Sequence, residues 1–488
     1  MATTTSGTAP AVPTGSVPLA AAGLGLGMLL SVLDQTIVSI ALPDIAADLG
    51  DVGSLSWIVT SYVLASTATG ALYGKLSDRF GRRPVFLAAV AVFTVASALC
   101  GMADSLTQLV AFRTLQGIGA GALFTIPTIA LAELFPVELR GRVQGAVGGI
   151  FALAAVGGPL VGGVITDAAG WRWIFYVNVP LGLLSMILVW IALRLPRSAH
   201  TVRLDIVGSL LLVGMVVGVL LITEWIGGIH SGGVGPILAL SVAVAMLLAG
   251  FIRQERRFSD PVLPMHLFTT RATGVVLAAT LLLGALMYAS IVYMPTYLRS
   301  AFDMSATEAG LALNPYVIAF MIASFLSGSI AGKTGRYRAV ISAGAAVIVI
   351  GLVLLGLLDA ESGYLVVAAS LLVLGIGVGM ILQLLVTVAQ NSVAASDLGA
   401  VTSAVLSVRG LGMSMGIAIY GSILGHQLSG QPVNPATTAD AIPDMLLWAL
   451  PPALVLLLLT LLLRDRLPAE GELVRADAGE SGSEPHPE

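Results

Sequence analysis

Apolar stretches of about 20 residues recur from residue 17 almost to residue 463, and they constrain the fold of this 488-residue chain more than any other feature. A helix of that length crosses the roughly 30 Å of hydrocarbon in a bilayer. The chain is 57% hydrophobic and only 10% charged, a balance that no soluble domain tolerates. Stretches such as 275–287 show neither charge nor alternation, which excludes the short alternating strands of a membrane β-barrel. We therefore predict an all-α membrane protein.

The apolar runs place about fourteen transmembrane helices along the chain. The expected helix starts are Val17, Ser56, Pro84, Thr107, Arg142, Trp173, Asp205, Gly235, Ala272, Ala306, Arg338, Gly363, Leu398 and Pro443. Because this number is even, both termini should lie on the same side of the membrane.

The distribution of Lys and Arg tests this layout, because basic residues collect in cytoplasmic loops. The opposite loops hold only Arg172 and Arg299, and Arg113 and Arg409 fall within predicted spans. We therefore expect both termini in the cytoplasm of a bacterium, with the chain crossing the cytoplasmic (inner) membrane many times. The basic loops contain Lys75, Arg79, Arg82, Arg83, Arg140, Arg142, Arg194, Arg197, Arg203, Arg253, Arg256, Arg257, Arg271, Lys333, Arg336 and Arg338.

An internal repeat supports a two-bundle design. The segment GALYGK at 70–75 ends the second predicted helix, and GSIAGK at 328–333 ends the tenth. Duplicated halves that rock about a central site are a transporter architecture. Chance similarity in a Gly- and Ala-rich chain is the alternative. We predict a disordered lead over 1–16 and a first six-helix bundle over 17–195. An inserted helix pair follows over 205–252, and a second six-helix bundle over 272–463. A disordered acidic cytoplasmic tail covers 464–488.

Several function classes find no support in the residues. The chain has no Gly-x-x-x-x-Gly-Lys-Ser/Thr phosphate-binding loop and no cytoplasmic domain long enough to hold one, so we do not expect it to be an ATP-driven pump by itself. Its five histidines are scattered, its single cysteine, Cys100, cannot form an internal disulfide, and no nucleophile has a partnered base. We expect no enzyme activity, no metal, no cofactor and no nucleic-acid partner.

Two opposite charges at membrane depth are the strongest chemical candidates. Asp34 lies about nine residues, roughly 13 Å of helix, before Pro43, which is too deep for its side chain to reach water easily. Burial favours the protonated carboxyl group and a nearby cation favours the ionised one, so Asp34 suits a proton carrier. Arg113, in the fourth predicted helix, is the expected partner. A static ion pair between the two helices is the alternative.

Two further charges and a glycine cluster are weaker candidates. Glu224 lies close to an outer helix end, where it can reach headgroup water, and Arg409 lies deeper beside glycines, where it could act in coupling or in helix packing. In GGPLVGG at 157–163, glycines spaced four apart present a flat face to a neighbouring helix, and a proline bends the chain. Packing without gating is the alternative for this motif, whose small and kinking residues are Gly157, Gly158, Pro159, Gly162 and Gly163.

These motifs together resemble the major facilitator superfamily. GKLSDRFGRR at 74–83 is similar to its loop between helices two and three, RTLQGIG at 113–119 to its helix-four motif, and 157–163 to its antiporter motif. LDQTIVSIALP at 33–43 and WRWIFYVNVPLG at 171–182 resemble the fourteen-helix drug:proton antiporter branch. The resemblance implies the major facilitator fold, with two six-helix bundles plus an inserted pair.

The resemblance also implies residue roles. Asp34 and Arg113 would handle protons, and Gly158 and Pro159 would shape the antiporter gate. Asp78 would help lock the cytoplasmic gate through charge pairs and a facing helix N-terminus. The second-half loop, GKTGR at 332–336, has no acid at the place of Asp78. The expected gating residues are Gly74, Asp78, Arg79, Gly81, Arg82 and Arg83.

The resulting hypothesis is a monomeric proton-driven exporter of hydrophobic drug-like molecules that works in membrane lipid without a cofactor. A cavity between the bundles would bind substrate. Because the second half offers no clear intramembrane carboxylate, we expect neutral or weakly cationic substrates. Export of an endogenous metabolite such as a self-made antibiotic, siderophore or amino acid, movement of a lipid, and a transporter-like receptor are the alternatives. The candidate cavity residues are Gln35, Trp57, Tyr62, Tyr293 and Gln383.

Overall fold

Every regular element in the described part of the chain is helical. The computed structural model describes residues 17–49, 56–194, 205–225, 234–258, 271–359, 361–393, 397–428 and 435–463. The predicted disordered ends, 1–16 and 464–488, lie outside these ranges. The helices are α1 (Val17–Leu49), α2 (Ser56–Phe80), α3 (Arg82–Gly101), α4 (Leu106–Leu134), α5 (Val137–Ala169), α6 (Trp173–Tyr176), α7 (Asn178–Ala192), α8 (Ile206–Glu224), α9 (Val234–Glu255), α11 (Arg271–Phe302), α12 (Ala306–Ala312), α13 (Asn314–Thr334), α14 (Tyr337–Gly356), α15 (Tyr364–Asn391), α16 (Leu398–Leu428), α17 (Pro435–Leu447) and α18 (Leu450–Leu461).

Within the described residues, eleven candidate spans are long and apolar enough to cross a membrane, and three of them each run over two consecutive helices: α6 and α7, α12 and α13, and α17 and α18. The helices α2 and α5 are long but are not among the eleven, and α8 contributes a shorter apolar segment, Ile206–Val219. The expectation of an all-α, multi-pass chain is therefore confirmed. The number of fourteen spans and the inserted pair stay predictions.

Helix boundaries follow glycine and proline. The third helix begins at Arg82 because Gly81 adopts a φ of 93°, a conformation that separates it from α2 and that side chains other than glycine rarely take. The region expected to begin one helix near Ala306 instead holds α12 and α13, and Pro315 stands in the first turn of α13. The last span is similarly divided, and α18 begins with a proline in its first turn.

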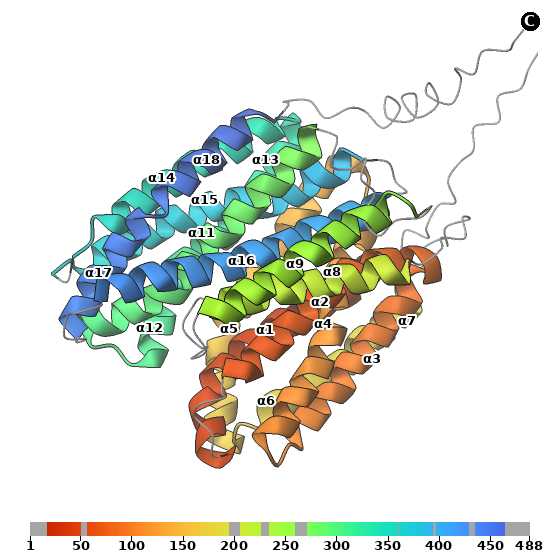
Figure 1. The fold of residues 1–488 in the computed structure, drawn as a ribbon, viewed down its shortest axis with the longest axis horizontal. Helices are drawn as coiled ribbons and strands as arrows, with labels where there is room; N and C mark the ends of the chain where they lie inside the picture. The colour runs from red at the N-terminus through yellow and green to blue at the C-terminus, as the bar shows by residue number, and fades with distance from the viewer. Residues whose placement is uncertain are drawn as a thin grey trace, which may run out of the picture.

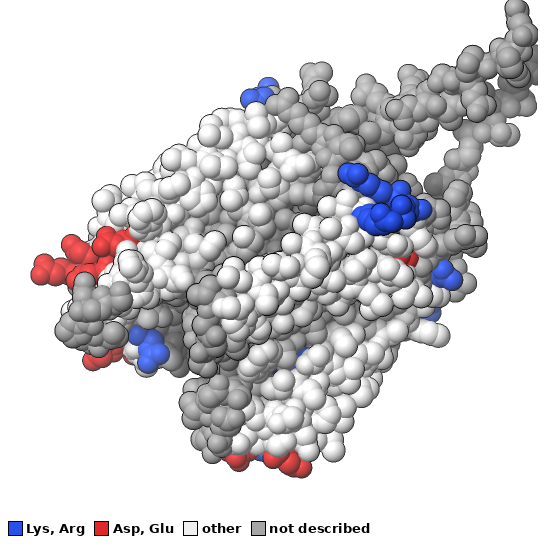
Figure 2. All heavy atoms as spheres, in the orientation of Figure 1, with Lys and Arg blue, Asp and Glu red and all other residues white. Residues whose placement is uncertain are grey.

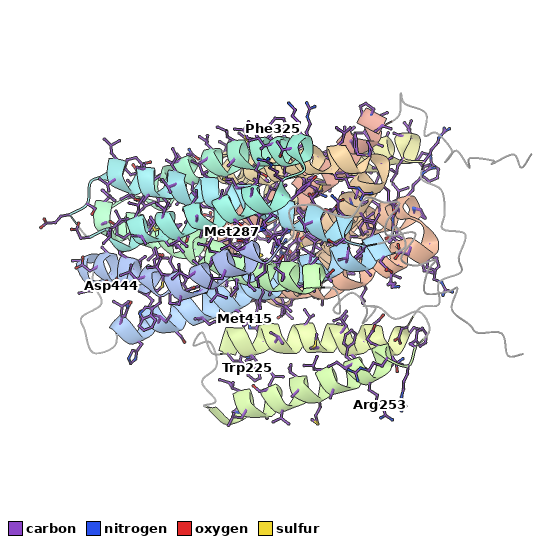
Figure 3. The ribbon with its side chains drawn as sticks, turned by 90° about the horizontal axis from the view of Figure 1, so that it is seen from above. Trp225, Arg253, Met287, Phe325, Met415 and Asp444 are labelled. Atoms are coloured by element: carbon purple, nitrogen blue, oxygen red, sulfur yellow. The ribbon has the colours of Figure 1, made fainter. Side chains whose placement is uncertain are left out.

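The helices form two bundles that meet at one end and diverge toward the other (Figure 1). The N-terminal bundle, α1 to α7, has its own buried apolar clusters. A larger cluster joins α11 to α18 and includes residues of α8 and α9. The helices α8 and α9 pack on each other along one side of the molecule, where α8 contacts α2 and α16 (Figure 3).

On the face shown in Figure 2, most basic side chains gather at one end of the helices and most acidic ones lie at the opposite tips, where one basic patch also appears. We call the first the basic end; the start of α3, the start of α5, the end of α9 and the end of α13 carry its residues. The unequal distribution of Lys and Arg between the two sets of loops therefore corresponds to two ends of the structure that differ in charge.

The two bundles approach each other most closely at the basic end. A Cβ atom on Gly74 of α2 would lie 2.5 Å from the carbonyl oxygen of Gly399 in α16. A Cβ on Gly141 of α5 would lie 2.8 Å from the carbonyl oxygen of Gly328 in α13. Since larger residues at these positions would separate the helices, the glycines hold the basic end closed.

Candidate functional site: a buried ion pair and a closed gate

Four helices of the N-terminal bundle bring together a buried polar group that we call the Asp34 cluster. It consists of Asp34 from α1, Ser97 from α3, Arg113 and Gln116 from α4, and Asn178 at the start of α7. Asp34 and Arg113 are each only 1% exposed. Asp34 lies near the middle of a 33-residue helix, far from either end. The expected partnership of Asp34 and Arg113 is therefore present in the structure.

The carboxylate of Asp34 accepts hydrogen bonds at both oxygens. Arg113 Nη1 lies 2.5 Å from Oδ2, and the amide nitrogens of Gln116 and Asn178 each lie 2.8 Å from Oδ1. The same two amides also donate to the hydroxyl of Ser97, at 3.1 Å and 3.0 Å. The charge is thus both paired and hydrogen-bonded, the condition under which a buried ion is tolerated.

Backbone and aromatic groups fix Arg113 in turn. Its Nε donates to the carbonyl oxygen of Ile58 at 3.2 Å, and its guanidinium carbon lies 4.1 Å from the centre of the Tyr62 ring. The Tyr62 hydroxyl donates to the carbonyl oxygen of Ser31 at 3.2 Å. These contacts link α1, α2 and α4, so a change in the ion pair must affect the packing of three helices.

A second charged group lies at the basic end and joins three helices of the N-terminal bundle. Arg82 lies 2.6 Å from the carboxylate of Asp78 and 2.7 Å from that of Glu133, and its Nη1 donates to the hydroxyl of Ser77. Arg82 is largely buried. The helix α2 is therefore tied to the start of α3 and the end of α4 by one guanidinium. Of these residues, Asp78 and Arg82 were expected from the sequence, whereas Glu133 was not.

Asp78 also faces the other bundle. A Cβ atom on Gly399, in the first turn of α16, would lie 2.8 Å from one carboxylate oxygen of Asp78. An acid beside a helix N-terminus is stabilised by the unpaired backbone N–H groups there. The structure thus places Asp78 against a facing helix N-terminus, as the resemblance implied.

Two other residues that were expected to form the gate, Arg79 and Arg83, contact aromatic rings. Arg83 lies over the ring of Trp190 with 4.5 Å from guanidinium carbon to ring centre, and Arg79 lies 5.4 Å from the ring centre of Phe80. Polar links across the bundles continue from α5 to α15. Arg140 donates to the side-chain oxygen of Asn391 at 3.1 Å, and Gln144 to that of Gln390 at 3.4 Å.

The glycine motif packs directly beside the Asp34 cluster. A Cβ atom on Gly158 would collide with the side chain of Thr36, and one on Gly162 would lie 3.1 Å from Ile37. Gly157 and Gly163 have no neighbour within 4 Å of such a Cβ. The flat face expected from the four-residue spacing is present, and its partner is α1 two residues beyond Asp34. The side chain of Pro159 lies outside the described part.

The candidate cavity residues do not form one group. Tyr62 is fully buried against Arg113, with Gln35 half-buried beside it and Trp57 half-buried in the first turn of α2. In the C-terminal bundle, the hydroxyl of Tyr293 donates to the carbonyl oxygen of Ile417 at 2.7 Å. Gln383 is 2% exposed and meets α5 near Gly148.

The two weaker charged candidates differ in what the structure shows. Arg409 of α16 is half-buried, and its guanidinium carbon lies 5.1 Å from the ring centre of Phe124 in α4, so it faces the N-terminal bundle. Arg409 is therefore not part of the Asp34 cluster. The side chain of Glu224, at the end of α8, is outside the described part.

A polar tether at the opposite end of the molecule was not anticipated. Asp48, at the end of α1, accepts hydrogen bonds from Arg172 at 2.6 Å and from the indole of Trp171 at 3.1 Å. The Arg172 hydrogen bond, followed by that of Trp171, lowers the pKa of Asp48. The tether joins α1 to the turn between α5 and α6.

Comparison with known proteins decides the family. The model of the Major Facilitator Superfamily matches residues 24–417. The chain belongs to the major facilitator superfamily. Its long apolar helices make it a multi-pass membrane protein of this family.

Individual relatives narrow the comparison. An uncharacterized MFS-type transporter of Mycobacterium tuberculosis is 36% identical over 422 residues, which cover 86% of this chain and 61% of that protein. The chain thus spans about three fifths of that relative's length. The multidrug transporter protein MdtP of Bacillus subtilis is 34% identical over 402 residues, covering 82% of this chain and 74% of that one. The human organic anion transporter MFSD10 shares the fold, with a TM-score of 0.64 at 16% identity over 91% of this chain and 99% of its own.

Proposed function

We propose that this protein is a proton-coupled antiporter that exports hydrophobic drug-like molecules by alternating access. The observation that carries the proposal is the buried Asp34 carboxylate, held 2.5 Å from the Arg113 guanidinium in the middle of α1. A charge at this depth costs roughly 2.5 to 3.5 kcal/mol on insertion scales, so one that is retained usually has a function. An acid that alternates between an ion pair and a neutral form is a direct means of carrying protons.

The proton step acts through the contacts of Asp34. Protonation removes the charge that Arg113 pairs with and leaves an O–H where Gln116 and Asn178 now donate. The cluster must then rearrange, and the stacked Tyr62 and the helices α1, α2 and α4 rearrange with it. Coupling follows if the proton and the substrate stabilise different states, since a ligand with equal affinity for both shifts nothing.

The conformation with a closed basic end corresponds to the outward-facing state in this scheme. Both termini and the basic loops would lie in the cytoplasm of a bacterial cell, and a monomer with fourteen spans, including α8 and α9 as an inserted pair, would carry out the cycle. Asp34 is sealed in this state, so a proton must enter as α1 moves. The contact of Gly158 with Thr36 is the point where α5 can guide that movement.

Two observations support the proposal that the substrates are hydrophobic: the name of one sequence relative and the state of the Asp34 carboxylate. A relative that shares 34% of its residues is named a multidrug transporter. Asp34, the described carboxylate at mid-membrane, is already occupied by three donors. It therefore offers little to a cationic substrate, which favours neutral or weakly cationic molecules.

The test is dye efflux from cells that express the protein, with and without an uncoupler, together with a drug-susceptibility panel. Uncoupler-sensitive efflux that Asp34→Asn abolishes is the expected result. Asp44→Asn is the matched control, because Asp44 is an exposed acid on the same helix. Secretion of a metabolite from the native host, lost on deletion without any change in drug susceptibility, would favour the endogenous-substrate alternative instead.

A further inference from the structure

A long groove on the C-terminal bundle lies outside the proposed transport pathway. The helices α13 and α14 follow each other in the chain, but each packs mainly on α15, so they diverge and leave α15 as the floor between them. The groove has a volume of about 1,090 Å³. In Figure 3 the label on Phe325 marks α13 at the edge of the molecule.

The groove is apolar and about as long as the membrane is thick. The α13 residues along it run from Pro315 to Thr334 at spacings of three or four, a distance of about 28 Å along a helix axis. The hydrocarbon core is about 30 Å thick. Ile322, Leu326 and Ile330 are each 51% exposed. The groove therefore opens on the outer surface of the bundle, where acyl chains surround the protein.

Positive charge stands where the groove meets the basic end. Arg336 is one of the residues that line the groove, and Lys333 precedes it by three residues, in the last turn of α13. Both are exposed, and neither forms an ion pair with any residue in the described ranges. At the corresponding place in the N-terminal bundle, Asp78 pairs with Arg82. The second-half loop lacks that acid, so its charge is left for an external anion.

We propose that this groove is a binding site for an anionic phospholipid, with one acyl chain between α13 and α14 and the phosphate headgroup on Lys333 and Arg336. Basic pockets between transmembrane helices on the cytoplasmic side bind such headgroups in other proteins. The apolar length gives the site its shape, and the two cations select the headgroup. The inference does not depend on the direction, the coupling or the substrate of transport.

The test uses the purified full-length chain in detergent, mixed with equal amounts of phosphatidylglycerol and phosphatidylcholine, with the retained lipid counted by native mass spectrometry. The wild-type chain is expected to retain phosphatidylglycerol preferentially. Lys333→Gln together with Arg336→Gln should weaken phosphatidylglycerol retention by about fivefold for each basic residue removed and leave phosphatidylcholine unchanged. Ala343→Phe, which places a ring in the groove from an exposed position of α14, should reduce retention of both lipids.

A matched control separates this site from general attraction to a basic surface. Arg253→Gln with Arg256→Gln removes the same charge beside a smaller hollow of about 430 Å³ at the end of α9. Phosphatidylglycerol retention should be unchanged in this control. The proposal is overturned if the control loses as much phosphatidylglycerol as Lys333→Gln with Arg336→Gln does. It is also overturned if Lys333→Gln with Arg336→Gln retains phosphatidylglycerol like the wild type, or if Ala343→Phe has no effect on lipid retention. A thermal unfolding profile like that of the wild type establishes that each variant is folded.

Discussion

Replacing Arg113 alone should harm the protein more than replacing both members of the buried pair. In Arg113→Gln, the Asp34 carboxylate keeps its two amide donors but loses the guanidinium 2.5 Å away, at a site that is 1% exposed. Stranding one partner of a buried pair costs about 3–5 kcal/mol. The two remaining donors place the expected loss at the lower end of that range.

The double variant, Asp34→Asn with Arg113→Gln, removes both charges and leaves two amides that can bond to each other and to Gln116. It should regain part of the loss, with a coupling of roughly 0.5–3 kcal/mol between the two positions. Thermal unfolding of the purified proteins in one detergent measures the order of stability. We expect the wild type to be highest, the double variant intermediate and Arg113→Gln lowest. A double variant no more stable than Arg113→Gln would refute the reasoning, because it would mean that the stranded charge is not what destabilises the single variant.

Three further perturbations follow from the same contacts. Asp78→Asn weakens the contact with the start of α16, an interaction of about 0.3–2 kcal/mol, so the basic end should open more often. In a protein whose native cysteine is replaced, thiol labelling of the buried position Ser403→Cys should then become about two- to thirtyfold faster in inside-out vesicles. Unchanged labelling would show that the contact between Asp78 and α16 does not hold the basic end closed. Gly158→Val should slow transport because its side chain collides with α1, with about 1–3 kcal/mol of overpacking, whereas Gly163→Val, which meets nothing, should behave like the wild type; equal effects would remove the α1 contact from the explanation. The hydrogen bond from Arg172 lowers the pKa of Asp48, so the ionised carboxylate should stabilise the protein fully above its ordinary pKa of 3.8, and this stabilisation should be lost as the pH falls further. The melting temperature of Asp48→Asn should therefore lie below that of the wild type at neutral pH and match it in strong acid. A difference in melting temperature that persists in strong acid would contradict this prediction.

The positions of most helices could be predicted because a bilayer demands long apolar runs, and these are visible in sequence. Breaks inside a span were harder to predict. The start of α13 at Asn314 depends on Pro315 within a continuous apolar region, so the pattern alone suggested one helix beginning near Ala306. The helix α3 starts at Arg82, two residues before the expected start near Pro84, because Pro84 is compatible with a first helical turn and gives no sign of the exact boundary.

The centre of the candidate site was predictable and its surroundings were not. Asp34 and Arg113 were conspicuous because charges are rare at membrane depth. Gln116 and Asn178 are neutral, and only the fold reveals that they share one carboxylate oxygen. The three-residue spacing from Arg113 to Gln116, which puts both on one helix face, was the available signal for the first. Glu133 was overlooked because an acid near a helix end normally faces water.

The central claim is that Asp34 couples substrate movement to protons, and reconstituted vesicles with an imposed pH gradient test it most directly. Wild-type protein should accumulate a hydrophobic dye against its concentration gradient and release protons in exchange. Asp34→Asn should still equilibrate the dye across the membrane but should not concentrate it. If Asp34→Asn accumulated the dye as strongly as the wild type under the same gradient, the buried carboxylate would have no part in coupling.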